Sequence, residues 1–374
     1  MYRRLLTLLF VGLLAGALQA QDPSFSQFYA NKVYLNPGFV GSDPGLTLAS
    51  NYRNQWSTVP GGFTTYAVSA TIQEPWINSG FGFNAMMDVE GAGLLSSVNM
   101  GLTYAYIIPF SDKFNINVGV RGSYNEKFID WSRLVFTDQL DEIYGIVSAT
   151  NAAPITDRAR FVDFDAGAVA RWEMKLGSNA MDNNLGFSVS HLLAPEESLQ
   201  EIGTRLPRRY TVHYGAMIPI VYFSKSIDKR VVYLSPNIKA DFQGDIEVFT
   251  YGLYLVTSPL YIGAFYQNRN PGFDLDNTNS LIFTVGFESQ LGASNRTVQI
   301  GYSYDTNITG LSTRTQGVHE LSLRFNLQDA SMYGYPQSKA ARARKSGRRR
   351  ARYGRGRRGS KCYRFGGRTA VGIF

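Results

Sequence analysis

The sequence predicts an all-β fold, a transmembrane outer-membrane β-barrel of about 14 antiparallel strands that carries a disordered basic C-terminal tail. Three observations lead to this fold class. Apolar and polar residues alternate in many segments of about eight to eleven residues between residues 46 and 326. Glycine and aromatic residues are abundant, with 37 Gly and 14% aromatic residues. The chain also begins with a short apolar stretch typical of exported proteins.

The first twenty residues have the features of a secretory signal peptide. Arg3 and Arg4 precede an apolar stretch from Leu5 to Leu18, and an Ala-x-Ala-like site with small residues lies at Ala17 to Ala20. The apolar stretch is shorter than the roughly twenty residues that span a bilayer. We therefore expect an exported chain whose mature form begins near Gln21.

Charge and composition divide the chain into four parts. The predicted parts are a signal peptide at 1–20, a periplasmic N-terminal segment at 21–45, a barrel at 46–326 and a basic periplasmic tail at 327–374. The net charge of +8 is an average of unlike parts. Residues 339–374 hold 14 Lys and Arg and no acids, whereas residues 21–338 hold 21 basic and 29 acidic residues.

The alternation gives each predicted strand one apolar and one polar face. In one segment Ile300 and Tyr302 fall on one face, while Ser303 and Asp305 fall on the other. The predicted strands are 46–56, 63–71, 81–89, 98–107, 114–124, 163–173, 185–192, 209–218, 231–241, 247–256, 260–268, 280–288, 297–305 and 319–326.

Alternation alone also fits a periplasmic β-sandwich or solenoid, so further features have to favour a membrane barrel. The segments are long enough for a tilted crossing of about nine to eleven residues, and closure into a barrel satisfies every backbone hydrogen bond in lipid. Aromatic residues near strand ends are typical of the membrane interfaces. These aromatic residues are Tyr104, Tyr106, Tyr251, Tyr254, Tyr261 and Tyr266.

An even number of strands predicts that both termini lie on the periplasmic side of the outer membrane. Tracing the chain from there places the longest connection, at 125–162, outside the cell. The connection at 257–259 is then a short periplasmic turn, as expected for such barrels.

Three stretches resemble the PorP/SprF family of the type IX secretion and gliding machinery of Bacteroidetes. Residues 21–42, QDPSFSQFYANKVYLNPGFVGS, resemble the family's opening segment, with Gly38 where alanine is usual. Residues 186–195, GFSVSHLLAP, are similar to a family strand ending in Ser-His-Leu. Residues 301–325 resemble its closing strands. The resemblance implies an outer-membrane component that works with periplasmic ring subunits and outer-membrane lipoproteins to export or anchor surface proteins such as adhesins. Residues 339–374 depart from the family pattern.

The N-terminal segment contains too many aromatic residues for a free linker in water. Two interpretations stay open: a plug within or under the barrel mouth, and a periplasmic docking strip for partner subunits. The hypothetical partner-binding residues are Asp22, Pro23, Phe25, Ser26, Gln27, Asn36 and Pro37.

The connection between the last two predicted strands is polar and contains glycine. It is either an ordinary hairpin loop or a contact surface for exported cargo, because external loops on a rigid barrel often carry recognition. The hypothetical cargo-facing residues are Tyr304, Asp305, Gly310 and Leu311.

The basic tail would suggest RNA binding in a cytosolic protein, but export excludes nucleic acid as a partner. Peptidoglycan, anionic lipid or acidic faces of partner subunits are then possible partners, and a solvated, disordered extension is the simplest alternative. The tail residues singled out are Arg348, Arg349, Arg350, Arg352, Arg355, Arg357 and Arg358.

No catalytic motif is recognised, so we expect no enzyme, no cofactor and no metal. The three histidines, His191, His213 and His319, lie in none of the usual hydrolase or metal-binding spacings. The predicted function is a non-catalytic scaffold or adaptor of type IX secretion that docks periplasmic ring or cell-wall-linked subunits. The alternatives are a general porin or solute channel and an outer-membrane hydrolase.

Overall fold

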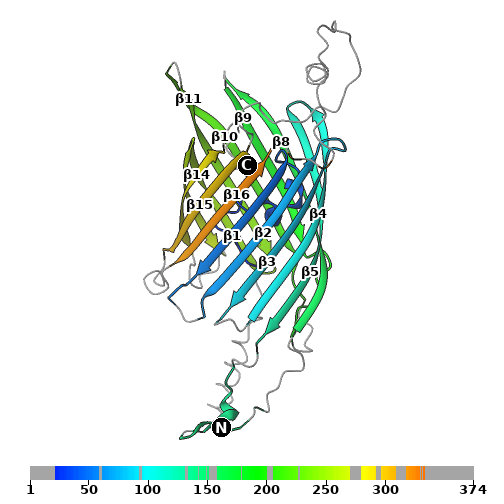
Figure 1. The fold of residues 1–374 in the computed structure, drawn as a ribbon, viewed down its shortest axis with the longest axis vertical. Coiled ribbons are helices and arrows are strands. Elements are labelled where there is room, and N and C mark those ends of the chain that lie inside the picture. Colours follow the sequence, from blue (N-terminus) through cyan, green and yellow to red (C-terminus); the bar gives the residue numbers. More distant parts are fainter. Residues whose placement is uncertain are drawn as a thin grey trace, which may run out of the picture.

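The computed structural model describes residues 22–330 and 332, except 59–60, 92–94, 131–133, 142, 149, 151–157, 178, 200–204, 226–227, 270–278, 292–295, 309–316 and 329. Among these residues, strands β1 to β5 and β8 to β16 close into one antiparallel barrel, in which β1 pairs with both β2 and β16 (Figure 1). The barrel strands are β1 Leu46–Gln55, β2 Phe63–Glu74, β3 Ser79–Glu90, β4 Leu95–Ser111, β5 Phe114–Ile129, β8 Arg158–Leu176, β9 Asn179–Ser190, β10 Arg209–Lys225, β11 Asp228–Gln243, β12 Ile246–Thr257, β13 Leu260–Arg269, β14 Ser280–Gln290, β15 Arg296–Asn307 and β16 Val318–Leu327.

Short elements outside the barrel wall complete the fold. Helix α2 and the 3-10 helix η1 precede β1, and η3, β6 and β7 lie between β5 and β8. Their bounds are α2 Lys32–Leu35, η1 Pro37–Phe39, η3 Thr137–Gln139, β6 Leu140–Asp141 and β7 Gly145–Ile146. No helix among the described residues has the length and apolar character needed to cross a bilayer.

The two faces of the wall are chemically opposite, as the alternation predicted. On β4, Leu102 and Tyr104 are exposed on the outside of the barrel, whereas Thr103 and Ala105 are buried inside. Ile300 and Tyr302 on β15 likewise face outward. An apolar exterior around a closed ladder is the arrangement that lipid requires, because no backbone group is left unpaired at an edge.

The two ends of the barrel differ in their connections. Leu46 at the start of β1 pairs with Leu327 at the end of β16, so the wall begins and finishes at the same end. The connections at this end are all short, and we call it the short-turn end. The connection from β5 to β8 is at the opposite, long-loop end, and its β6–β7 hairpin projects away from the wall (Figure 1).

Every predicted strand corresponds to a strand of the barrel, and the largest differences are in length. β8 runs from Arg158 to Leu176, well beyond the predicted 163–173, and β9 begins at Asn179 rather than 185. Ladder hydrogen bonds continue past the alternating segments, because strands that extend beyond the lipid need no apolar face.

Two of the six aromatic residues expected at the membrane interfaces lie elsewhere. Tyr254 and Tyr261 are each only 4% exposed and belong to a buried apolar cluster inside the lumen. Tyr104, Tyr106 and Tyr251 are exposed on the outer face as expected. Alternation places Tyr251 and Tyr254, three residues apart on β12, on opposite faces, but it does not show which face meets lipid when both carry aromatic residues.

Candidate functional site

Residues 22–43 run through the lumen, and we call this segment the plug. At its start, Asp22 contacts His191, directly after β9, and Arg209, the first residue of β10. Two residues after the plug, Gly45 lies against the backbone of Leu327 at the short-turn end. The plug therefore extends from the long-loop end of the lumen back to the first strand.

Asn36 joins the middle of the plug to the wall. Its side-chain amide donates to the carbonyl oxygens of Ala168 and Phe187, each at 3.1 Å, and lies 3.2 Å from Nε2 of His213. Its Oδ1 accepts a hydrogen bond from the backbone N–H of Gly38 at 2.8 Å, which caps η1. Asn36 is fully buried, so these contacts replace water at a group that is costly to bury unpaired.

Glycines in the wall make room for the plug backbone. A Cβ on Gly119 of β5 would lie 2.4 Å from the carbonyl carbon and oxygen of Pro37, and a Cβ on Gly167 of β8 would lie 2.2 Å from Oδ1 of Asn36. Neither distance is compatible with a side chain. The wall thus contains a preformed seat for residues 36–38.

Apolar side chains of the plug pack against an apolar patch on the inner wall. The part of the inner wall that the plug covers carries apolar side chains, which the plug shields from water. The cluster consists of Phe28, Tyr29, Leu35 and Phe39 from the plug and Val169, Met217, Tyr254, Val256, Tyr261, Phe265 and Ile282 from the wall.

Two buried carboxylates of the last strands hold the first turn of the plug. Glu320 accepts the backbone N–H groups of Ser26 and Gln27 at 2.8 and 3.2 Å, and Asp305 accepts the Ser26 hydroxyl. Arg53 of β1 lies 3.3 Å from Glu320 and 3.5 Å from Asp305, so a cation offsets this buried negative charge.

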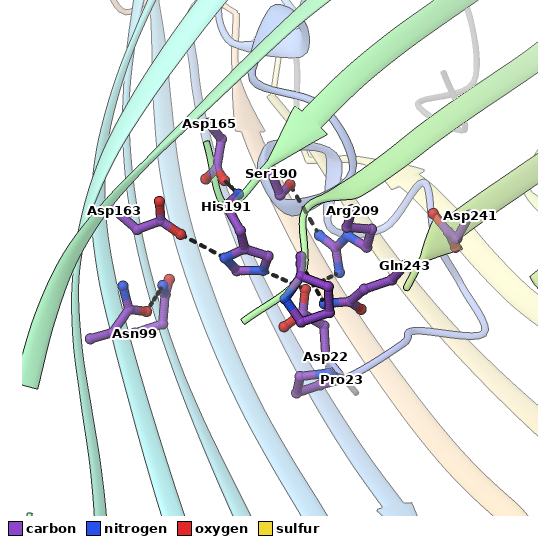
Figure 2. A network of polar contacts seen from close by, with 12 residues as sticks. Asp22, Pro23, Asn99, Asp163, Asp165, Ser190, His191, Arg209, Asp241 and Gln243 are labelled. Carbon is purple, nitrogen blue, oxygen red and sulfur yellow. Dashed lines mark hydrogen bonds and ion pairs between the residues drawn. The ribbon is translucent and has the colours of Figure 1, made fainter. Parts of the chain in front are cut away.

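An ion-pair cluster, which we call the clasp, holds the start of the plug (Figure 2). The Asp22 carboxylate lies 2.7 Å from Nε2 of His191 and 2.9 Å from the Arg209 guanidinium. Nδ1 of His191 lies 2.6 Å from Asp163, and its backbone N–H donates to Asp165 at 3.1 Å. The imidazole ring is therefore held between two carboxylates.

This arrangement shifts the protonation equilibria of the clasp. Burial disfavours a charged imidazole, but the carboxylates of Asp22 and Asp163 outweigh it and raise the pKa of His191 to about 9. Burial would also raise the pKa of Asp22, but His191 and Arg209 hold it well below its usual range. The clasp is thus an imidazolium between two carboxylates at neutral pH.

Asp163, Asp165 and His191 also bring three potential metal ligands within 4.8 Å of one another. Their ligand atoms are already engaged, because both ring nitrogens of His191 contact carboxylates and Asp165 contacts Arg121 at 2.5 Å. These contacts are those of an ion-pair network rather than of a metal centre.

Between the plug and the long-loop end lies a cavity of about 830 Å³, which we call the vestibule. Its floor includes Asp22, Phe25 and Tyr34 of the plug. Its wall carries charged groups of both signs near the strand ends. They are Arg53, Asp88, Glu90, Arg121, Glu126, Lys127, Glu197, Arg209, Lys239, Asp241, Arg269 and Asp305.

The residues singled out from the sequence are distributed unevenly over this site. The proposed partner-binding set lies in the plug, which is one of the two interpretations that the sequence left open; Phe25, Ser26, Gln27 and Asn36 are buried in the lumen. Asp305 binds Ser26 from inside the wall, and Tyr304 precedes it on β15. Gly310, Leu311 and all the selected tail arginines lie outside the described residues.

Sequence reasoning missed the residues of the wall that hold the plug. The sequence motifs give no role to His191, Arg53, Arg209 or Glu320. A signal was present, because Arg53 and Glu320 occupy lumen-facing positions in alternating strands. Charged residues at such positions need partners, but the sequence did not identify them.

Comparisons with known proteins give a family for this chain. The model of the family described as "Type IX secretion system membrane protein PorP/SprF" matches residues 17–325. No curated protein matches the chain.

Three solved structures resemble the chain at low sequence identity. A FadL homologue of Pseudomonas aeruginosa is 12% identical with a TM-score of 0.39, covering 83% of this chain and 94% of its own. The TodX deltaS2S3 mutant, a monoaromatic hydrocarbon channel, is 10% identical with a TM-score of 0.39 and coverage of 78% and 92%. BamA from Haemophilus ducreyi lacking POTRA domains 1–3 is 9% identical with a TM-score of 0.36 and coverage of 75% and 70%.

The family match covers most of the chain, including the plug and nearly the whole wall, and it agrees with the resemblance of the opening, middle and closing stretches. The chain is a closed barrel of the kind that resides in the outer membrane. It belongs to the PorP/SprF family of type IX secretion system membrane proteins.

Proposed function

We propose that this chain is a non-catalytic scaffold of the type IX secretion machinery in the outer membrane. The single observation that carries the proposal is the plug. A segment that fills the lumen, with its own seat, apolar cluster and clasp, makes the barrel a solid support for partner proteins. The family membership supplies the secretion context.

The plug also weighs against the alternative of a general porin. A solute channel needs a continuous aqueous path with polar walls. Here the apolar cluster lies between the vestibule and the short-turn end, and Val256 and Ile282 within it are fully buried.

The orientation that we propose places the short-turn end in the periplasm and the long-loop end outside the cell, following the rule for barrels of this class. The tail then leaves the wall on the periplasmic side, after Leu327. Asp22, in contrast, lies toward the outer end, because the plug runs the length of the lumen. This differs from the expectation of a periplasmic N-terminal segment.

We propose that partners meet the two ends of this support. Periplasmic ring subunits and outer-membrane lipoproteins would contact the short-turn end, aided by the basic tail, with anionic lipid or peptidoglycan as further ligands of the tail. Exported surface proteins such as adhesins would contact the long-loop end. The buried residues of the plug would hold the scaffold in shape rather than touch these partners directly.

Planar-bilayer conductance of the purified, refolded barrel tests the proposal. We expect the complete mature chain to be electrically silent, and a variant lacking residues 22–43 to conduct, because removal of the plug opens the lumen. A stable open conductance from the complete chain would contradict the scaffold proposal and favour the alternative that the barrel is a general porin. Affinity purification from solubilised outer membrane should in parallel recover other type IX subunits.

A further inference from the structure

The β6–β7 hairpin exposes apolar side chains at a place where neither lipid nor the barrel interior covers them. The exposed apolar residues of the wall face lipid, whereas this hairpin lies beyond the strand ends and projects away from the wall (Figure 1). Ile143 and Tyr144 in its turn are 83% and 80% exposed, compared with 71% for Leu102 on the lipid-facing wall. Exposed apolar patches in water mark interaction sites. The exposed apolar residues of the hairpin are Leu140, Ile143, Tyr144, Ile146 and Val147.

Local hydrogen bonds fix the shape of the hairpin tip. Oδ1 of Asp141 accepts the backbone N–H groups of Ile143 and Tyr144 at 2.8 and 2.9 Å. Gly145, which pairs with Asp141 across the hairpin, has a φ of 72°, a conformation that glycine adopts without strain. The tip therefore presents its apolar side chains on a preorganised backbone, which lowers the entropic cost of binding a partner.

The tip is acidic as well as apolar. Residues 134–157 contain four acidic residues and no Lys or Arg. The backbone N–H groups of Ile143 and Tyr144 lower the pKa of Asp141, and no described base contributes to this shift, so the carboxylate is ionised at neutral pH. Negative charge at an exposed apolar tip attracts cationic groups and repels anionic ones.

This charge distinguishes between the surfaces that could cover the tip. The outer leaflet of an outer membrane carries phosphate groups, so the acids of the tip would be repelled by it. A second copy of the hairpin carries the same negative charge and would be repelled as well. A protein surface with lysine or arginine beside apolar side chains matches both the charge and the apolar character of the tip.

We propose that the β6–β7 hairpin docks on a protein surface that carries apolar side chains beside lysine or arginine. Ile143 and Tyr144 are the apolar anchors of this contact, and the basic side chains of the partner lie against Asp141. The choice of an exported surface protein as the partner rests on the proposed function, in which such proteins meet the long-loop end.

Fluorescence anisotropy with the complete mature barrel in nanodiscs of zwitterionic lipid tests this inference. The probes are fluorescein-labelled, end-blocked hexapeptides of alternating leucine and arginine, leucine and glutamate, and serine and arginine. We expect saturable binding of the leucine–arginine peptide alone, weakened about tenfold or more by the double substitution Ile143→Ser and Tyr144→Ser. Leu193→Ser is the matched control, because Leu193 is exposed in the β9–β10 connection at the same end, and it should leave binding unchanged.

A second variant, Asp141→Asn, separates the charge of the tip from its shape. The asparagine Oδ1 can accept the same two backbone N–H groups, so the turn is retained while the negative charge is removed. We expect weaker binding of the leucine–arginine peptide and a smaller dependence of this binding on salt. Equal binding of the leucine–glutamate peptide, or unchanged affinity in the double variant, would overturn the proposal.

The other two occupants give distinct results with the same variants. Self-association of the wild-type barrel that the double variant loses would overturn the proposal in favour of a second copy. Binding of the nanodisc-held barrel to vesicles that contain lipid A, again lost in the double variant, would overturn it in favour of the outer leaflet. Conductance reports on the plug rather than on the hairpin, so this inference can fail while the scaffold proposal stands, and the reverse also holds.

Discussion

The position of the plug depends on a few closely packed residues of the plug and the wall. Asn36 satisfies two wall carbonyls and caps η1 with a single side chain, and Gly119 and Gly167 leave the space that Asn36 and Pro37 occupy. In a close-packed interior, an added methyl group cannot be absorbed when the facing atom belongs to the backbone.

Substitution Gly119→Ala should therefore destabilise the barrel. The new Cβ would lie 2.4 Å from the Pro37 backbone, and forced displacement of this kind costs about 1–3 kcal/mol. The midpoint of urea unfolding in lipid vesicles measures the effect. Gly122→Ala in the same strand is the matched control, since its Cβ first meets the Phe164 ring at 3.4 Å. Equal unfolding midpoints for the two variants would contradict the close contact between Gly119 and the plug.

The clasp predicts a pH dependence in a defined window. The pKa of His191 is raised from 6.5 to about 9 in the folded chain, so its stabilising contribution is fully present below pH 6.5 and is lost as the pH rises through 9. The contribution is on the order of 3 kcal/mol. The pKa of Asp22 is lowered, so its contribution is present above about pH 4 and is lost in acid.

Unfolding of the wild-type chain and of His191→Asn at pH 6 and pH 9.5 tests this dependence. Asparagine tolerates the positive φ of 60° at this position, so the variant removes the imidazolium without adding backbone strain. The wild-type chain should lose stability at pH 9.5, and the variant should change much less. If the variant loses as much stability as the wild-type chain between pH 6 and pH 9.5, the titrating group is not His191.

At the scale of elements, the strands were predictable and the plug conformation was not. In β15 and β16, apolar residues face lipid and polar residues face the lumen, so their alternation can be read from the sequence one residue at a time. α2 and η1 are only four and three residues long, and their geometry depends on Asn36 and on a seat formed by strands far along the chain. The sequence therefore indicated a segment that must dock somewhere, but not the wall residues that receive it.

The tail gives a prediction at this scale. Deletion of 339–374 should leave the barrel inserted in the outer membrane, because every barrel strand up to β16 remains, but should reduce recovery of periplasmic subunits with the barrel. The 14 positive charges make any such contact sensitive to salt. Quantitative co-purification at low and high ionic strength measures both effects. A tail in which all 14 Lys and Arg are replaced by Ser is the charge control, and recovery unaffected by either change would refute docking through the tail.

At the scale of the whole molecule, the apolar exterior makes a lipid bilayer the environment in which the folded barrel is stable. Leu102, in the middle of β4, is 71% exposed on the outer face, so an arginine there would face lipid. We expect Leu102→Arg to lower stability by about 2–4 kcal/mol and to reduce the inserted fraction. Val135→Arg, in the connection between β5 and β8, is the control and should be neutral. Membrane fractionation and heat-modified gel mobility measure the inserted barrel.

The course of the plug has a consequence for biogenesis. Residues 22–43 leave the ribosome before any strand, yet their contacts come from β5, β8 and β9 and, last of all, from Asp305 and Glu320 near the carboxyl end. The contacts from Asp305 and Glu320 form only once β15 and β16 are in place. We therefore expect the plug to gain its last wall contacts in the same stage of assembly in which β16 pairs with β1 and closes the barrel.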